Sequence, residues 1–152
     1  METLRIGSYS EGTMRDADLI PTFLDALEDV DKERADKLEA ESGTTDEESW
    51  EDFVDKDPEA ASQLTTDLFD VLGEYCPEYC DFGASEGDGA SFGCWPDVEA
   101  LQEAVRDGEV LDFDKLDRPS VGQLVCEVNE RGNVSLYRVK VSMELEEVWA
   151  IV

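Results

Sequence analysis

The sequence has 152 residues, with 40 Asp and Glu against 12 Lys and Arg, no His, and a formal net charge of −28. A charge of this size repels the phosphates of nucleic acids and of anionic membranes, so we expect no direct binding to either. The same charge attracts basic proteins and divalent cations, or it suits a cytoplasm full of salt.

Hydrophobic residues make up 41% of the chain, including 6 Phe, 4 Tyr and 3 Trp, which is enough apolar surface for a folded core. The length favours a single acidic α+β domain over residues 1–152. The sequence contains no apolar run of about 18 residues, as a membrane helix needs, and its first residues lack a secretory signal pattern. We therefore expect a cytoplasmic protein.

A short strand is expected over residues 3–9, and after it apolar residues recur at the spacing of amphipathic helices. We expect four such helices, over residues 16–30, 31–41, 45–54 and 58–73. Gly43 suits the end of the second helix, and Thr45 with Glu48 forms a Thr-x-x-Glu capping pattern for the third. Pro21 is expected in the first turn of the first helix, where its missing N–H costs nothing.

Residues 75–95 contain three of the four cysteines and two runs of residues that mirror each other. Folding the chain at Gly87 predicts a glycine-rich antiparallel hairpin with the facing pairs Ala84–Ala90, Phe82–Phe92 and Cys80–Cys94. Gly87 and Gly89 are expected to supply positive φ angles in its tight turn.

A fifth helix is expected from Pro96 to Arg106, and after it the apolar spacing changes from that of helices to that of strands. Strands over residues 123–128, 133–139 and 145–152 predict an antiparallel meander. The fold class expected is α+β, with N-terminal helices packed on a mostly antiparallel sheet that contains both the hairpin and the meander.

Two sequence motifs carry a resemblance to a known family, together with the stretch Asp18–Leu27. Residues 82–95 read FGA-x-x-GDG-x-x-FG-x-W, and residues 132–137 read GNVSLY. The chain thus resembles a family of small acidic proteins of unknown function from phages, prophages and other mobile elements. The resemblance implies an origin but no activity. Ser85 and Cys94 stand where such proteins frequently carry a histidine and an aromatic residue, which argues against a catalytic hairpin.

The four cysteines allow several states. Cys76, Cys80, Cys94 and Cys126 could ligate zinc, but only the first two are close in sequence, whereas zinc sites usually repeat a close pair. A Cys80–Cys94 disulfide fits the expected hairpin register. A cytosolic protein keeps its thiols reduced, however, so we expect buried free thiols and no metal.

No motif for catalysis or cofactor binding is recognisable. The turn Glu86-Gly87-Asp88-Gly89 lacks the ligand series of a calcium-binding EF-hand loop. Adjacent acids such as Glu146 and Glu147 are expected by chance among 40 acids, and no nucleophile–base set, phosphate loop or dinucleotide fingerprint accompanies them. We expect neither enzyme activity nor a cofactor.

The acids are densest over residues 16–59, where 18 acids and four bases give a net charge of −14. Exposed carboxylates on helices, which rise about 1.5 Å per residue, can match DNA, which carries about one charge per 1.7 Å of axis. We therefore predict a non-enzymatic inhibitor that mimics DNA or RNA in the basic cleft of a host defence protein, of the anti-CRISPR or anti-restriction type.

Ten acids of this region are the predicted partner-binding residues: Asp25, Glu28, Asp29, Glu33, Asp36, Glu47, Glu48, Glu51, Asp52 and Asp55. The alternative is a haloarchaeal or halovirus protein whose acidity is salt adaptation and whose binding function is unrelated. The five Lys residues and the 20 acids that follow Glu59 agree with this alternative.

Overall fold

The structure of the protein is a computed structural model that describes residues 2–44, 48–117, 119–140 and 145–151. The chain divides into two compact units, Met1–Pro96 (unit 1) and Asp97–Val152 (unit 2). Both contain helix and strand, and the sheets are mostly antiparallel, so the fold class is α+β as expected. The single domain expected over residues 1–152 stays a prediction.

The helices of unit 1 follow the predicted apolar pattern: α1 (Asp16–Val30), α2 (Lys32–Ser42), α3 (Trp50–Lys56) and α4 (Pro58–Glu74). In α1, Ile20, Phe23 and Leu27 are fully buried, because their spacing places them on one face of the helix. Gly43 ends α2 in the left-handed conformation, as predicted.

Three local expectations about these helices are wrong. Pro21 lies in the second turn of α1, where it removes one backbone hydrogen bond, because the first turn of a helix that begins at Asp16 ends before residue 21. Helix α3 begins at Trp50, since the Ser49 hydroxyl accepts the N–H of Asp52 at 3.2 Å and caps it there. Gly73 does not end α4, which continues to Glu74. Thr45 of the expected capping pattern lies outside the described residues.

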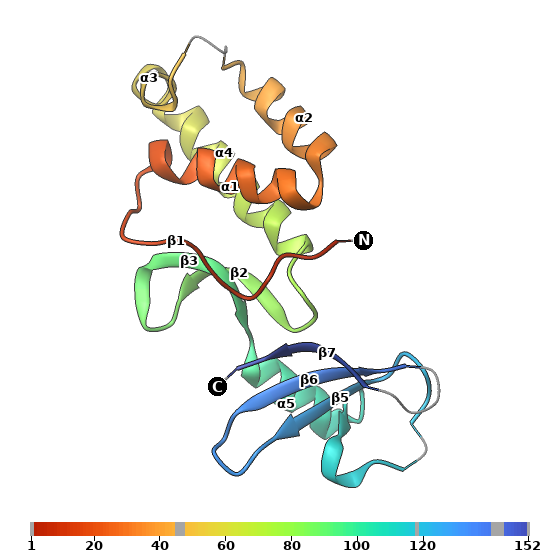
Figure 1. Cartoon of the computed structure of the whole chain (residues 1–152). Helices are drawn as coiled ribbons and strands as arrows, with labels where there is room; N and C mark the ends of the chain where they lie inside the picture. The colour runs from red at the N-terminus through yellow and green to blue at the C-terminus, as the bar shows by residue number, and fades with distance from the viewer. Residues whose placement is uncertain (1, 45–47, 118, 141–144, 152) are drawn as a thin grey trace. The chain divides into compact units, whose positions relative to one another are not determined.

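Unit 1 contains an antiparallel sheet in the order β1 (Gly7–Ser10), β3 (Asp88–Pro96), β2 (Cys80–Ser85). Helices α1 and α4 contact this sheet, and α2 and α3 pack on those two helices (Figure 1). The ring of Phe23 lies edge-on to the rings of Phe69 and Phe82, with centroids 5.1 and 5.2 Å apart. This aromatic cluster joins the helices to the sheet in the core of unit 1.

The register of β2 against β3 differs from the predicted one by two residues. Phe82 faces Cys94 rather than Phe92, and Cys80 faces Pro96 rather than Cys94. The mirrored pairing fails because β3 carries an irregularity next to the turn, so that Ser85 pairs with Asp88. The positive φ angles expected at Gly87 and Gly89 are also wrong, since neither glycine adopts one.

Unit 2 combines α5 with a second sheet; its elements are α5 (Val98–Asp107), β4 (Leu111–Asp112), a 3₁₀ turn (Phe113–Lys115), β5 (Leu124–Val128), β6 (Val134–Val139) and β7 (Leu145–Ala150). Strands β5, β6 and β7 form the predicted antiparallel meander. The two-residue strand β4, which the sequence pattern did not indicate, pairs in parallel with β5. The expectation that this sheet also contains β2 and β3 is wrong, because those strands pair with β1 in unit 1.

Candidate partner-binding surface

The carboxylates predicted to bind a partner lie on successive helices of unit 1. Those that are exposed are Asp25, Glu28 and Asp29 on α1, Glu33 and Asp36 on α2, and Glu51, Asp52 and Asp55 on α3. Glu48 is different, because only 14% of its side chain is exposed and its Oε1 lies 2.9 Å from Lys56 Nζ. Glu47 lies outside the described residues.

Bases of the same unit neutralise several of these acids. Lys32 Nζ lies 3.4 Å from Glu28 Oε1 near the end of α1 and 3.4 Å from Asp36 Oδ1 on α2, four residues away on each side. Arg15 Nη2 lies 3.2 Å from Glu51 Oε1 and joins the start of α1 to α3. The four-residue spacing around Lys32 is a signal that the sequence alone carries. Because these pairs are exposed, each contributes little to stability, yet each of the two bases offsets one negative charge of the surface.

Among the exposed acids predicted to bind a partner, five form no salt bridge in the part of the chain that the structure describes: Asp25, Asp29, Glu33, Asp52 and Asp55. Asp25 and Asp29 are four residues apart on α1, and Asp52 and Asp55 are three apart on α3, so each pair shares a helix face. Like charges in such positions repel each other. A cationic partner would relieve that repulsion.

Helix α1 sets the distance between these acids. Its 15 residues span about 22 Å. The contact between Arg15 and Glu51 places α3 beside the start of α1, and α2 leaves from the other end (Figure 1). The carboxylates of α3 and those of α2 therefore lie toward opposite ends of α1.

A polar network fixes the junction of α1 and α2 to the end of α4. The Tyr75 hydroxyl donates to Asp31 Oδ2 at 2.6 Å, and Arg34 Nη1 donates to both Tyr75 and Glu74. The Arg34 guanidinium also lies 5.8 Å from the centre of the Tyr75 ring. Sequence reasoning missed this network, since no local pattern links Asp31 to a tyrosine 44 residues away.

The network changes the ionisation of its members. The Tyr75 hydroxyl, and after it the backbone N–H of Arg34, lower the pKa of Asp31 below its ordinary value of 3.8. The Glu74 carboxylate is the largest cause that raises the pKa of Arg34, followed by Tyr75. Asp31 and Arg34 thus stay charged and hold α2 in place beside α1.

The negative charge is unevenly divided between the two units. Unit 1 has 27 acids and 6 bases, a net charge of −21 over 96 residues. Unit 2 has 13 acids and 6 bases, a net charge of −7 over 56 residues. The strongest attraction for a basic partner therefore lies in unit 1.

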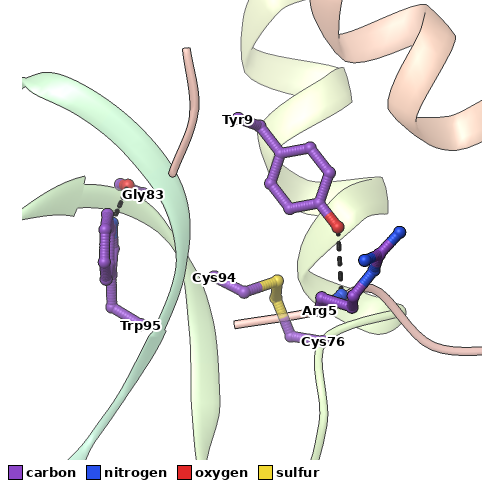
Figure 2. The surroundings of a disulfide bond; sticks show 6 residues. All are labelled: Arg5, Tyr9, Cys76, Gly83, Cys94 and Trp95. Atoms are coloured by element: carbon purple, nitrogen blue, oxygen red, sulfur yellow. Dashed lines mark hydrogen bonds between the residues drawn. A yellow bond between two sulfur atoms is a disulfide. The ribbon is translucent and has the colours of Figure 1, made fainter. Parts of the chain in front are cut away.

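Cys76 and Cys94 form a disulfide with their α-carbons 5.9 Å apart, which corrects the expectation of free thiols at these positions. The bond joins the chain just after α4 to the second half of β3 (Figure 2). Around it, the Tyr9 hydroxyl accepts the N–H of Arg5 at 3.0 Å, and Trp95 Nε1 donates to the Gly83 carbonyl at 3.0 Å. The hydrogen bonds and the disulfide hold the N-terminal segment, β2 and β3 in a fixed arrangement.

Cys80 and Cys126 are free and buried. Burial raises the pKa of Cys80 to about 12, and burial followed by the nearby Asp112 carboxylate raises that of Cys126. Because the disulfide occupies two of the four sulfurs, the four-cysteine zinc site considered above has only two thiols left. Within the described ranges, no three His, Cys, Asp or Glu side chains are grouped so as to hold a metal ion.

Comparison with protein-family models, with curated proteins and with solved structures finds no match. None of the helices in the described ranges has both the length and the apolar character needed to cross a membrane.

Proposed function

We propose that the protein is a non-enzymatic polyanionic inhibitor that mimics DNA or RNA and occupies the basic cleft of a host defence protein. The target class would be a restriction enzyme or a CRISPR effector of the host cell, and the chain would come from a phage or another mobile element. The binding surface would be the helical layer of unit 1, and it would include the five exposed acids that form no ion pair in the described structure.

The observation that carries this proposal is the concentration of charge in unit 1, at −21 against −7 in unit 2. A surface adapted only to salt would be acidic throughout. Here a structured layer of helices presents Asp25, Asp29, Glu33, Asp52 and Asp55 as exposed carboxylates that form no salt bridge within the described ranges.

The dimensions of the layer also suit a nucleic-acid cleft. The 22 Å or so along α1 correspond to about six base pairs of duplex, at roughly 3.4 Å per phosphate on each strand. A protein cleft that binds DNA gains affinity when condensed ions leave the phosphates. Carboxylates fixed on helices offer the cleft a similar negative charge without any nucleic acid. The Tyr75–Asp31 hydrogen bond keeps α2, one of those helices, in position.

Salt adaptation is the second candidate, and the acidity of unit 2 favours it. That unit has 13 acids against 6 bases, although it contributes none of the predicted partner-binding residues. A protein adapted to molar salt loses its structure in dilute buffer, because unscreened carboxylates repel one another. A cooperative unfolding transition in about 0.15 M salt would favour mimicry instead.

The test of mimicry is capture of proteins from host lysate on the immobilised protein, with release by duplex DNA and mass spectrometry of what is released. In the test variant, Asp25, Asp29, Glu33, Asp52 and Asp55 are each changed to Lys. In the matched control, five exposed acids of unit 2 receive the same change: Glu103, Asp107, Glu109, Asp117 and Glu130.

Both variants carry the same net charge, so any difference between them reports position rather than total charge. Mimicry predicts that the wild type and the unit 2 variant retain nucleic-acid-binding proteins that DNA displaces, and that the unit 1 variant does not. Equal loss in both variants, or retention of no nucleic-acid-binding protein by the wild type, would overturn the proposal.

A further inference from the structure

A small groove opens between three helices of unit 1. Its volume is about 200 Å³. Its apolar lining comes from α2, α3 and α4, and consists of Leu38, Phe53, Ala60 and Leu64. Phe53 and Leu64 are buried at 7% and 6% exposure, whereas Leu38 and Ala60 are only half-buried. The groove therefore has a buried apolar floor and accessible apolar walls.

Ala60 lines the groove at the start of α4. Ala60 lies in the first turn of α4, where its N–H is held by the carboxylate of the capping residue Asp57 at 3.1 Å. Trp50, which packs edge-on against Phe53 with ring centroids 5.6 Å apart, supports the groove from α3.

The polar lining of the groove is acidic. Glu41 at the end of α2 is exposed, and Asp67 on α4 is half-buried and accepts a hydrogen bond from Gln63 Nε2 at 2.9 Å. Among the residues that the structure describes, no Lys or Arg lines the groove. A side chain that enters it thus meets an apolar floor and two carboxylates, a combination that suits an apolar residue with basic neighbours.

We propose that this groove binds a single apolar side chain, of leucine type, within a basic segment of the partner protein. The inference rests on the proposed function, because that function supplies the basic partner. It adds a contact that charge mimicry alone lacks, since DNA presents no side chain to a cleft. The groove would give the protein a preference among basic partners that carboxylates cannot provide by themselves.

The test uses two fluorescent oligolysine peptides of equal length and charge, one with a central leucine and the other with a central serine. Binding to the wild-type protein is measured by fluorescence anisotropy in about 0.15 M salt. We expect the leucine peptide to bind about tenfold more tightly, because partial burial of one leucine side chain accounts for such a factor.

Two variants locate the preference. Ala60→Phe fills the groove and should reduce the ratio of the two affinities to about one, while binding of the serine peptide stays unchanged. Ala100→Phe is the matched control, since Ala100 is also half-buried and its N–H is held by the helix-capping Asp97 at 2.9 Å. The control should keep the tenfold ratio.

A further measurement keeps the proposal open to refutation if Ala60→Phe does not fold. In the wild type, the leucine peptide should shift the methyl NMR signals of Leu38 and Leu64 more than the serine peptide does. Equal affinities for the two peptides, an unchanged ratio in folded Ala60→Phe, or methyl shifts elsewhere would each refute the groove as the site. Self-association that folded Ala60→Phe abolishes would assign the groove to a second copy of the chain and would also refute the proposal.

The peptide result is separate from the lysate result. A preference for the leucine peptide that depends on Ala60 would stand even if no DNA-displaceable protein were retained. Conversely, retention of such proteins with equal affinity for both peptides would support mimicry and eliminate the groove.

Discussion

The α-carbon of Gly93 faces the carbonyl of Gly7 so closely that a methyl group placed on it would lie 1.9 Å from the Gly7 oxygen. The contact lies where β1 pairs with β3, with Ser8 opposite Gly93 in the register. Both neighbours are backbone atoms, so no side-chain rotation can relieve the overlap. Only glycine at residue 93 lets β1 join the sheet.

Gly93→Ala should therefore destabilise the protein by about 3 kcal/mol, the upper end for inserting a methyl group into packed structure. The measurement is urea unfolding followed by circular dichroism. Gly83→Ala is the control, because Gly83 pairs with Gly93 in the register but has no atom within 4 Å of an added methyl group. A control change larger than that of Gly93→Ala would contradict the assigned contact.

The hydrogen bond from Tyr75 to Asp31 should make part of the stability depend on pH. The pKa of Asp31 is lowered in the folded protein, so its contribution is present above the ordinary value of 3.8 and is lost as the pH falls through the lower folded value. Tyr75→Phe removes the largest cause, and the pKa of Asp31 should move back toward 3.8.

NMR titration of the Asp31 carboxyl carbon measures this shift directly. The stability difference between wild type and Tyr75→Phe should be larger at about pH 6 than at an acidic pH below the lowered folded pKa of Asp31, where Asp31 is protonated in both folded and unfolded chains. Tyr79→Phe serves as the control for loss of a phenolic hydroxyl. An Asp31 titration that is the same in wild type and Tyr75→Phe would show that the hydroxyl does not hold this carboxylate.

Reduction of the disulfide should lower the stability of unit 1. Cys76 and Cys94 are 18 residues apart, and a loop of this size corresponds to a stabilisation of about 3 kcal/mol. The wild type should lose about this amount when a dithiol reductant is added to the unfolding experiment. Cys76→Ser should be less stable from the start, and the reductant should leave it unchanged. A wild type insensitive to the reductant would contradict the assigned pairing.

The two free thiols should resist modification in the folded protein. The thiolate is the reactive form, and burial raises the pKa of Cys80 to about 12 and also raises that of Cys126. At about pH 8, a thiol-reactive dye should label the native protein slowly and should label two thiols per chain once guanidinium unfolds it. Rapid labelling of two thiols in the native state, or of four in the unfolded state without reductant, would contradict this assignment.

Much of the fold can be predicted from the sequence where the signal is local. The apolar spacing of Ile20, Phe23 and Leu27 gives α1 the bounds seen in the structure, and the strand spacing after Gln123 gives the meander. The pairs of Lys32 with Glu28 and Asp36 also follow from a four-residue spacing.

Features that depend on distant contacts could not be predicted. The irregularity in β3 leaves no mark in the mirrored sequence around Gly87, and Cys76 gives no sign of its bond to Cys94. In the candidate partner-binding surface too, local features could be predicted and those that depend on distant contacts could not. Its exposed acids were predicted from composition and helical spacing, whereas the burial of Glu48 against Lys56 and the groove beside Ala60 arise only when helices pack.

The disulfide helps to determine the register in which β2 and β3 pair. A slip of two residues, to the pairing that the mirrored sequence suggests, keeps every side chain on its original face of the sheet. Apolar burial alone therefore separates the two pairings poorly. The slip would move Cys94 about 6.8 Å along β2, and Cys94 would face Cys80 instead of reaching Cys76. The disulfide is therefore compatible with only one of two strand registers that bury nearly the same apolar side chains.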